Sequence, residues 1–271
     1  MQKFIFLFIS FFYLNTIAFS GSNLDKIKPK PFVLQNGETL IYEVRWLSIK
    51  IGEIKIVVNR NNLSNIYRAE AYINSADGLP FANVHAVIKS VFSDQISPLS
   101  STSWEKESEN LWSVMEYEYD NPKTRAVIKR GSSPAIETEF VRFHKSDTLV
   151  VNQTIQDGFS IFFFARRNLG SNETLSVRTL VQGETGNALM RFYNKQTEAR
   201  IKVVDFPIDV VEFDGIAKFK GIFGLTGDFK GWFSNDEARV PIRAQLGVIL
   251  GNVDIELIQW ERDGWNPPNA R

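Results

Sequence analysis

Alternation of apolar and polar residues with a period of two is the feature of this 271-residue chain that most constrains its fold. The run LIYEVRW at residues 40–46 and the run IKIVV at residues 54–58 both alternate in this way, and Gly52 lies between them. Such alternation places successive side chains on opposite faces of a strand. We therefore predict two antiparallel strands that form a hairpin around Gly52.

The same pattern recurs along the chain, with turn residues at intervals of roughly 8 to 14 positions. In LWSVMEYEYD, residues 111–120, it places Trp112 and Val114 on one face and Met115 and Tyr117 on the other. This rhythm of short strands and turns is typical of an all-β sandwich or barrel. No composition change after the first 30 residues indicates a linker, so we expect one β-rich domain.

One segment near the middle departs from the alternation. TIQDGFSIFFFARRNLG, residues 154–170, spaces its apolar residues as a helix does. Asp157 or Ser160 is suited to cap its start, and Gly170 its end. The fold class predicted is thus all-β and mainly antiparallel, as a single curled sheet or open β-barrel with one short helix near the middle of the chain.

The N-terminus has the layout of a secretory signal peptide. Lys3 precedes an apolar run, and the small residues Ala18 and Ser20 stand two positions apart before Gly21. We expect residues 1–20 to be a signal peptide, 21–32 a flexible leader, 33–265 the domain and 266–271 a tail. Retention of the first segment as an anchor is the alternative. The chain has no cysteine, which excludes disulfides and an N-terminal acyl-cysteine anchor. These features favour a periplasmic location.

Residues able to do chemistry are few. The 31 basic and 31 acidic residues balance, which argues against a nucleic-acid partner. His85 and His144 are the only histidines and fall in separate predicted strands, so neither a catalytic triad nor a zinc site is indicated. No glycine-rich phosphate-binding motif has the required spacing. We expect no enzyme activity, no cofactor and no metal.

WFSNDEAR, residues 232–239, is the stretch most like an active site, yet each residue has a structural use. Asn and Asp favour turns because their side chains bond to nearby backbone groups. We interpret Asp236 and Arg239 as a structural turn with an ion pair, Arg239 pairing with Asp236 or Glu237. Pro241, which lacks an N–H, is suited to an edge or bulged strand.

Three motifs are similar to those of the DUF3108 family of bacterial exported proteins. GETLIYEVRWLSIKIG at residues 37–52 resembles its G-E-x-L-x-Y-x-v-x-W opening, QDGFSIFFFARR its D-x-x-S-x-x-Y/F-x-x-R segment, and WFSNDEARVPIR its C-terminal W-x-S-x-D-x-x-R-x-P hairpin. The resemblance implies a periplasmic or outer-membrane-associated β-rich protein and supplies no catalytic residues. The matching positions are Gly37, Glu38, Tyr42, Trp46, Gly52, Asp157, Arg166, Trp232, Ser234, Asp236, Arg239 and Pro241.

Aromatic abundance without catalytic groups leads to the first functional hypothesis, a non-enzymatic cell-envelope protein that carries a lipid or acyl chain in a β-barrel cavity. The residues expected to line that cavity are Trp46, Trp112, Phe162, Phe163, Phe164 and Trp232. The second hypothesis is a scaffolding protein that binds another envelope protein through a sheet edge or the face at residues 104–119. The third is a polysaccharide hydrolase with Asp236 or Glu237 as the acid/base.

Overall fold

The computed structural model describes residues 32–61, 64–78, 83–120, 125–150, 154–218, 227–248 and 251–270. The predicted signal peptide and nearly all of the predicted leader lie outside these ranges. Residues 31–271 form one compact unit. Its tail is part of the domain, because the amide of Asp209 donates to the carbonyl of Pro268 and that of Ala270 to Pro207.

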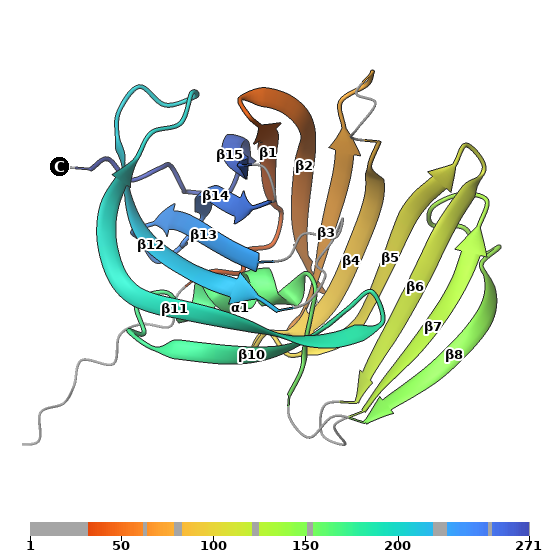
Figure 1. Ribbon diagram of the computed structural model, residues 1–271. Helices are drawn as coiled ribbons and strands as arrows, with labels where there is room; N and C mark the ends of the chain where they lie inside the picture. The colour runs from red at the N-terminus through yellow and green to blue at the C-terminus, as the bar shows by residue number, and fades with distance from the viewer. Residues whose placement is uncertain are drawn as a thin grey trace, which may run out of the picture. The chain divides into compact units, whose positions relative to one another are not determined.

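Fifteen strands in the described residues form one sheet, which confirms the predicted fold class (Figure 1). Its first half contains β1 (Glu38–Trp46), β2 (Ile49–Arg60), β3 (Ile66–Ser75), β4 (His85–Ser93), β5 (Pro98–Ser108), β6 (Leu111–Asp120), β7 (Arg125–Ser133) and β8 (Arg142–Val150). The second half contains β9 (Gln156–Asp157), β10 (Thr174–Val181), β11 (Glu184–Ala199), β12 (Ile208–Ala217), β13 (Gly227–Ser234), β14 (Pro241–Gly247) and β15 (Asn252–Glu261), and the helix α1 (Ser160–Asn168) precedes β10.

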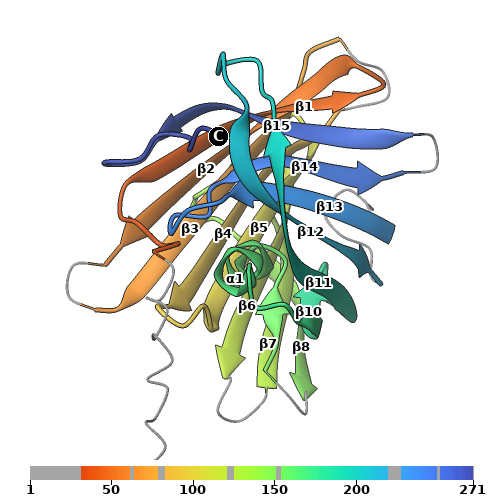
Figure 2. The ribbon, with the colours of Figure 1, turned by 90° about the vertical axis from the view of Figure 1, so that its left-hand side faces the viewer.

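The strand order is β8-β7-β6-β5-β4-β3-β2-β1-β15-β14-β13-β12-β11-β10-β9. The first and last long strands of the chain, β1 and β15, thus pair in the middle of the sheet. All pairs are antiparallel except that of β9 with β10. The sheet is open, since β8 and β9 are its two edges, and it curls around α1, which Figure 2 shows end-on inside the curl. We call the face on which α1 packs the concave face.

The β1–β2 hairpin differs in one detail from the prediction. Its turn lies at Leu47 and Ser48, and Gly52 lies within β2. Glycine is needed there because the backbone of β3 approaches closely: a Cβ at position 52 would lie 2.5 Å from the carbonyl oxygen of Asn74. Alternation cannot distinguish a glycine that makes a turn from one that admits a neighbouring strand.

The main core lies between α1 and the concave face of the central strands. Phe163 of α1 is fully buried, and its ring centroid lies 5.2 Å from that of Phe92 and 5.5 Å from that of Phe159. A second cluster joins the opposite side of α1 to β10–β13, around Phe192, Phe213 and Phe233. The Phe-rich helix therefore forms the centre of the core, with both of its apolar sides covered by sheet.

Candidate functional site

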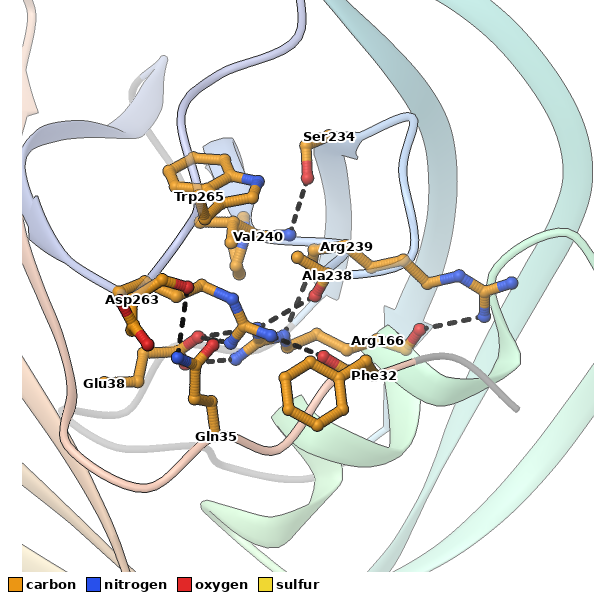
Figure 3. Close-up of polar contacts among 12 residues, drawn as sticks. Phe32, Gln35, Glu38, Arg166, Ser234, Ala238, Arg239, Val240, Asp263 and Trp265 are labelled. Carbon is orange, nitrogen blue, oxygen red and sulfur yellow. Dashed lines mark hydrogen bonds and ion pairs between the residues drawn. The ribbon is translucent and has the colours of Figure 1, made fainter. Parts of the chain in front are cut away.

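A fully buried ion cluster closes one end of the concave face (Figure 3). The guanidinium of Arg166 makes a bidentate contact with Glu38, at 2.6 Å from Nη1 to Oε1 and 3.1 Å from Nη2 to Oε2. Arg262 donates to the same Glu38 carboxylate and to the carbonyl of Phe32. Neither Glu38 nor Arg166 has any exposed surface. The cluster thus ties the start of β1, the helix α1 and the segment after β15 together.

The carbonyls of the β13–β14 turn complete the cluster. Arg166 donates from Nε to the carbonyl of Arg239 at 3.1 Å and from Nη2 to that of Ala238 at 3.0 Å. Tyr42 donates its buried hydroxyl to the carbonyl of Pro241 at 3.1 Å. Burial raises the pKa of the Tyr42 hydroxyl well above its usual value, so it stays a neutral donor.

Asp236 organises that turn through both of its oxygens. Its Oδ1 accepts from the Ser234 hydroxyl at 2.8 Å and from the amides of Ala238 and Arg239 at 3.0 Å each. Its Oδ2 accepts from the indole of Trp265 at 2.8 Å. Glu237 beside it is exposed. These contacts hold the chain reversal between β13 and β14, and Pro241 lies at a break in the β13–β14 register.

Arg239 meets Asp236 through its backbone amide, while its guanidinium has other partners. Nη1 donates to the carbonyls of Arg166 and Arg167, at 3.1 Å and 2.7 Å. These carbonyls belong to the last turn of α1, where a cation also complements the helix dipole. The predicted side-chain ion pair is thus replaced by a cap on the helix, 72 and 73 residues away in sequence.

A second polar group lies at the other end of α1. Asp157 accepts from the amides of Phe159 and Ser160 at 2.7 Å each and from the Ser90 hydroxyl at 2.6 Å. The N-cap residue is Phe159, whose side chain makes no capping bond, and the Asp157 carboxylate two residues earlier accepts from the first amides in its place. Burial raises the pKa of Asp157 above its ordinary value. A small pocket of about 40 Å³ adjoins it, lined by polar residues such as Ser101 and Glu105 and by apolar ones such as Leu180 and Val181. That volume holds water-sized molecules only.

Side chains on the concave face are less buried toward the ends of the strands that lie far from the ion cluster. Along β1, Leu40 and Tyr42 are buried, and Val44 and Trp46 are only partly so. The same change occurs along β2, β3 and β14, with partly buried apolar residues at Ile54, Ile73 and Leu246. On β15, Ile255 is partly buried and lies between the buried Leu257 and Val253. Register places these residues on one face, since Val44 pairs with Ile255 and Tyr42 with Ile54. The end far from the ion cluster therefore has a partly exposed apolar lining.

The structure brings together some of the six predicted cavity aromatics and separates others. Phe162 and Phe163 lie on α1 with ring centroids 5.3 Å apart, and Phe164 is packed against both main clusters. Trp46 lies on the concave face at its exposed end. Phe163 itself is packed on all sides and lines no open space.

Trp112 and Trp232 lie on the face opposite α1. Trp112 packs with Trp104 and Val114. The residues of β6 that alternate with Trp112 and Val114 face the concave side of the sheet. Trp232 donates its indole N–H to Glu212 at 3.0 Å, with the cations of Lys230 and Arg243 over its ring. Alternation predicts that Trp232 and Phe233 face opposite ways, but not which of them faces the helix.

The ion cluster is the part of the site that the sequence did not reveal. Glu38 and Arg166 were identified only as positions of a family motif, and Arg262 was not singled out. The one signal available was an acidic residue directly before an apolar alternating run, which is too common to indicate burial. The described residues contain no group of three His, Cys, Asp or Glu side chains able to hold a metal ion. In the same part of the chain, no helix is long and apolar enough to cross a membrane.

The chain is similar to solved structures and to one protein family. A structure described as a β-barrel-like protein of domain of unknown function DUF1849 from Brucella abortus is 10% identical, covers 84% of this chain and 98% of its own, and has a TM-score of 0.42. A search of curated proteins finds no match. The model of the family described as "Protein of unknown function (DUF3108)" matches residues 41–258. The chain, whose Tyr42, Arg166, Asp236 and Arg239 all contribute to the contacts described above, belongs to the DUF3108 family.

Proposed function

We propose that this protein binds a hydrophobic ligand, a lipid or acyl chain, on the exposed end of its concave face and acts in the cell envelope without catalysis. The observation that carries the proposal is the partly exposed apolar lining formed by Val44, Trp46, Ile54, Ile73 and Ile255. Burial of such surface is favourable wherever an apolar partner replaces water. Ile54, Ile73 and Ile255 border the main core and remain only partly buried.

The ligand position differs from that expected from the aromatic residues alone. The helix end with Phe159 and Phe163 is packed, so it forms the floor of the site. Phe162 is partly buried and lies at the border between this floor and the sheet. A chain bound on the concave face would therefore rest on Phe162 and extend along β1 and β15, away from the ion cluster.

The absence of catalysis is part of the proposal. Glu38, Asp157 and Asp236 have the arrangement of structural carboxylates, since each accepts several hydrogen bonds from groups of the fold. A general acid or base must instead exchange a proton with a substrate within hydrogen-bond reach. An exported, periplasmic location is supported by the signal-like sequence of residues 1–20.

The test is binding of a fluorescent fatty-acid probe, together with native mass spectrometry of protein purified gently from a bacterial envelope. We expect probe binding and a lipid adduct that refolding removes. Trp46→Ala and Ile255→Ser should weaken probe binding by about fivefold or more, since each removes buried apolar contact. Trp112→Ala is the matched control, because Trp112 lies on the opposite face and should leave affinity unchanged. Absence of probe binding, or equal loss in all three variants, would contradict the proposal.

A second candidate, binding of another envelope protein, is favoured by the edge strand β8. Its residues are mostly exposed on both faces, including Phe143 and Val150, and its outer edge has no neighbouring strand among the described residues. An extended segment of a partner could add there as a further strand. The check is site-specific crosslinking from β8 in cells, with Phe143→Asp/Val150→Asp as the variant that should abolish the product.

A further inference from the structure

The tip of the β1–β2 hairpin combines exposed apolar side chains with an unfavourable backbone. Leu47 and Ser48 have φ values of 46° and 69°, and Leu47 and Ile49 are each 53% exposed. Two-residue hairpin turns with positive φ at both positions are normally Asn-Gly or Asp-Gly. Leucine at such a position is strained, and strain of this kind gathers at functional sites. Leu47 therefore lies at a position where neither burial of its side chain nor the backbone conformation of the turn favours leucine.

This tip lies where the concave face is most exposed. Trp46 pairs with Val253 of β15, so the β1–β2 turn and the β14–β15 turn lie at the same end of the sheet. The two turns touch, because a Cβ on Gly251 would lie 3.1 Å from Leu47 Cδ2. The apolar lining of the concave face begins directly below, at Trp46 and Val44. Ile49 pairs with Trp46 across the hairpin, so the exposed tip and the start of the lining share one face.

We infer that the β1–β2 tip docks the protein on a lipid bilayer by inserting Leu47 and Ile49. Two side chains on a narrow turn are far too little surface for a stable protein interface, which needs roughly 800 Å² per partner. Shallow insertion of a few apolar side chains is enough for reversible membrane contact. Docking in this orientation opens the lined concave face toward the bilayer. This inference rests on the proposed function, because an opening that faces the membrane lets an acyl chain enter the proposed ligand site.

The local charges indicate that the bilayer need not be anionic. Lys50 pairs with Glu53 at 2.5 Å, and Arg45 pairs with Glu43 at 2.5 Å. Cations with such partners offer little net attraction to negative headgroups. Docking is therefore hydrophobic, and it should proceed on neutral phosphatidylcholine vesicles with little dependence on salt.

The experiment is co-sedimentation of the purified protein with phosphatidylcholine vesicles at low and high salt. The informative variant is Leu47→Asn/Ser48→Gly, which removes the apolar side chain and also supplies the preferred turn residues. It should partition about tenfold more weakly, as expected for one large apolar side chain, while melting at a higher temperature than the wild type. Ile49→Asn should also weaken partitioning. Val203→Asn is the control, because Val203 is 46% exposed between β11 and β12, at the opposite end of the sheet.

The outcomes separate the docking inference from the proposed function. Weaker vesicle binding in a stable tip variant that still binds the soluble fatty-acid probe supports docking. Unchanged vesicle binding in that variant, or no binding by the wild type, overturns it, even if the probe binds. Binding that requires anionic lipid and disappears at high salt also overturns it. A protein that keeps vesicle binding but binds no probe would instead overturn the ligand proposal.

Discussion

Glu38 carries one negative charge between two guanidinium groups, those of Arg166 and Arg262. Moving any of these charges out of water is costly, and the cost is offset only when every ion has close partners. The remaining N–H groups of the arginines donate to the carbonyls of Phe32, Ala238 and Arg239. Because a single carboxylate serves both cations, the cluster depends more on Glu38 than on either arginine.

The first prediction concerns this carboxylate. Glu38→Ala leaves two buried guanidinium groups without a counter-ion and should lower the free energy of unfolding by about 3 to 5 kcal/mol. Urea unfolding at neutral pH measures it. Glu53→Ala is the control, since it removes half of an exposed pair and should cost less than about 1 kcal/mol. Equal losses in the two variants would show that the buried cluster contributes no more than a surface pair.

The second prediction concerns Asp157, whose pKa is raised chiefly because burial disfavours its charged form. A raised folded-state pKa means that its contribution to stability is full below the unfolded value of 3.8 and is lost as pH rises through the folded value. Asp157→Asn keeps an acceptor oxygen for the helix amides but does not titrate. The variant should therefore gain stability relative to the wild type as pH rises from about 4 toward neutrality. Urea unfolding of both proteins across this range is the measurement, and a constant difference would contradict the reasoning.

At the scale of elements, α1 is held at both ends by charged residues from outside the helix. Asp157 accepts the first amides, and the Arg239 guanidinium donates to the last carbonyls. The cation of Arg239 also has the sign that the helix dipole favours at this end. A helix of nine residues is too short to be stable alone. These two contacts and the aromatic packing therefore determine whether the floor of the proposed site is ordered.

The third prediction tests this capping. Arg239→Gln removes the contacts to the carbonyls of Arg166 and Arg167, so amide exchange should accelerate in residues 160–168 more than elsewhere. The stability loss should be about 1 to 3 kcal/mol, the usual cost of losing charged hydrogen bonds. Hydrogen exchange with mass spectrometry resolves the location. Arg243→Gln is the control, because the Arg243 guanidinium lies over the ring of Trp232, on the face opposite α1. Equal acceleration in both variants would mean that Arg239 does not act through the helix.

The elements were predictable from the sequence, whereas the contacts between them were not. Alternation correctly indicated that Leu40 and Tyr42 share one face of β1, and helical spacing identified α1 within residues 154–170. Both patterns depend on residues close in sequence. The contacts of Glu38 with Arg166 and Arg262 join residues 128 and 224 positions apart, and no local pattern contains that information. The prediction that the hairpin turns at Gly52 was wrong for the same reason, since the backbone that approaches Gly52 belongs to another strand.

At the scale of the whole domain, side-chain contacts join the two halves of the curled sheet where the backbone ladder is open. The amide of Gly183, in the β10–β11 turn, donates to the Tyr117 hydroxyl of β6 at 3.0 Å, and Arg130 of β7 donates to the Gly183 carbonyl at 3.3 Å. Near β9, Ser90 bonds to Asp157 and Gln156 to the carbonyl of Ile96. We call these contacts the seam. A sheet closed by side chains can open without breaking any strand pair, unlike a complete barrel.

The last prediction is that the seam opens at Tyr117. Tyr117→Phe keeps the ring but removes the acceptor of the Gly183 amide, which is only partly shielded from water. Exchange of amides in residues 180–186 should accelerate by about tenfold, and the free energy of unfolding should fall by about 1 kcal/mol. Tyr72→Phe is the matched control, since the Tyr72 hydroxyl bonds to Glu70 of its own strand, away from the seam. If exchange at the β10–β11 turn is the same in both variants, packing alone joins the two halves. If only Tyr117→Phe accelerates it while β1 and β15 stay protected, the curl opens locally at the seam, and the concave face is adjustable in width.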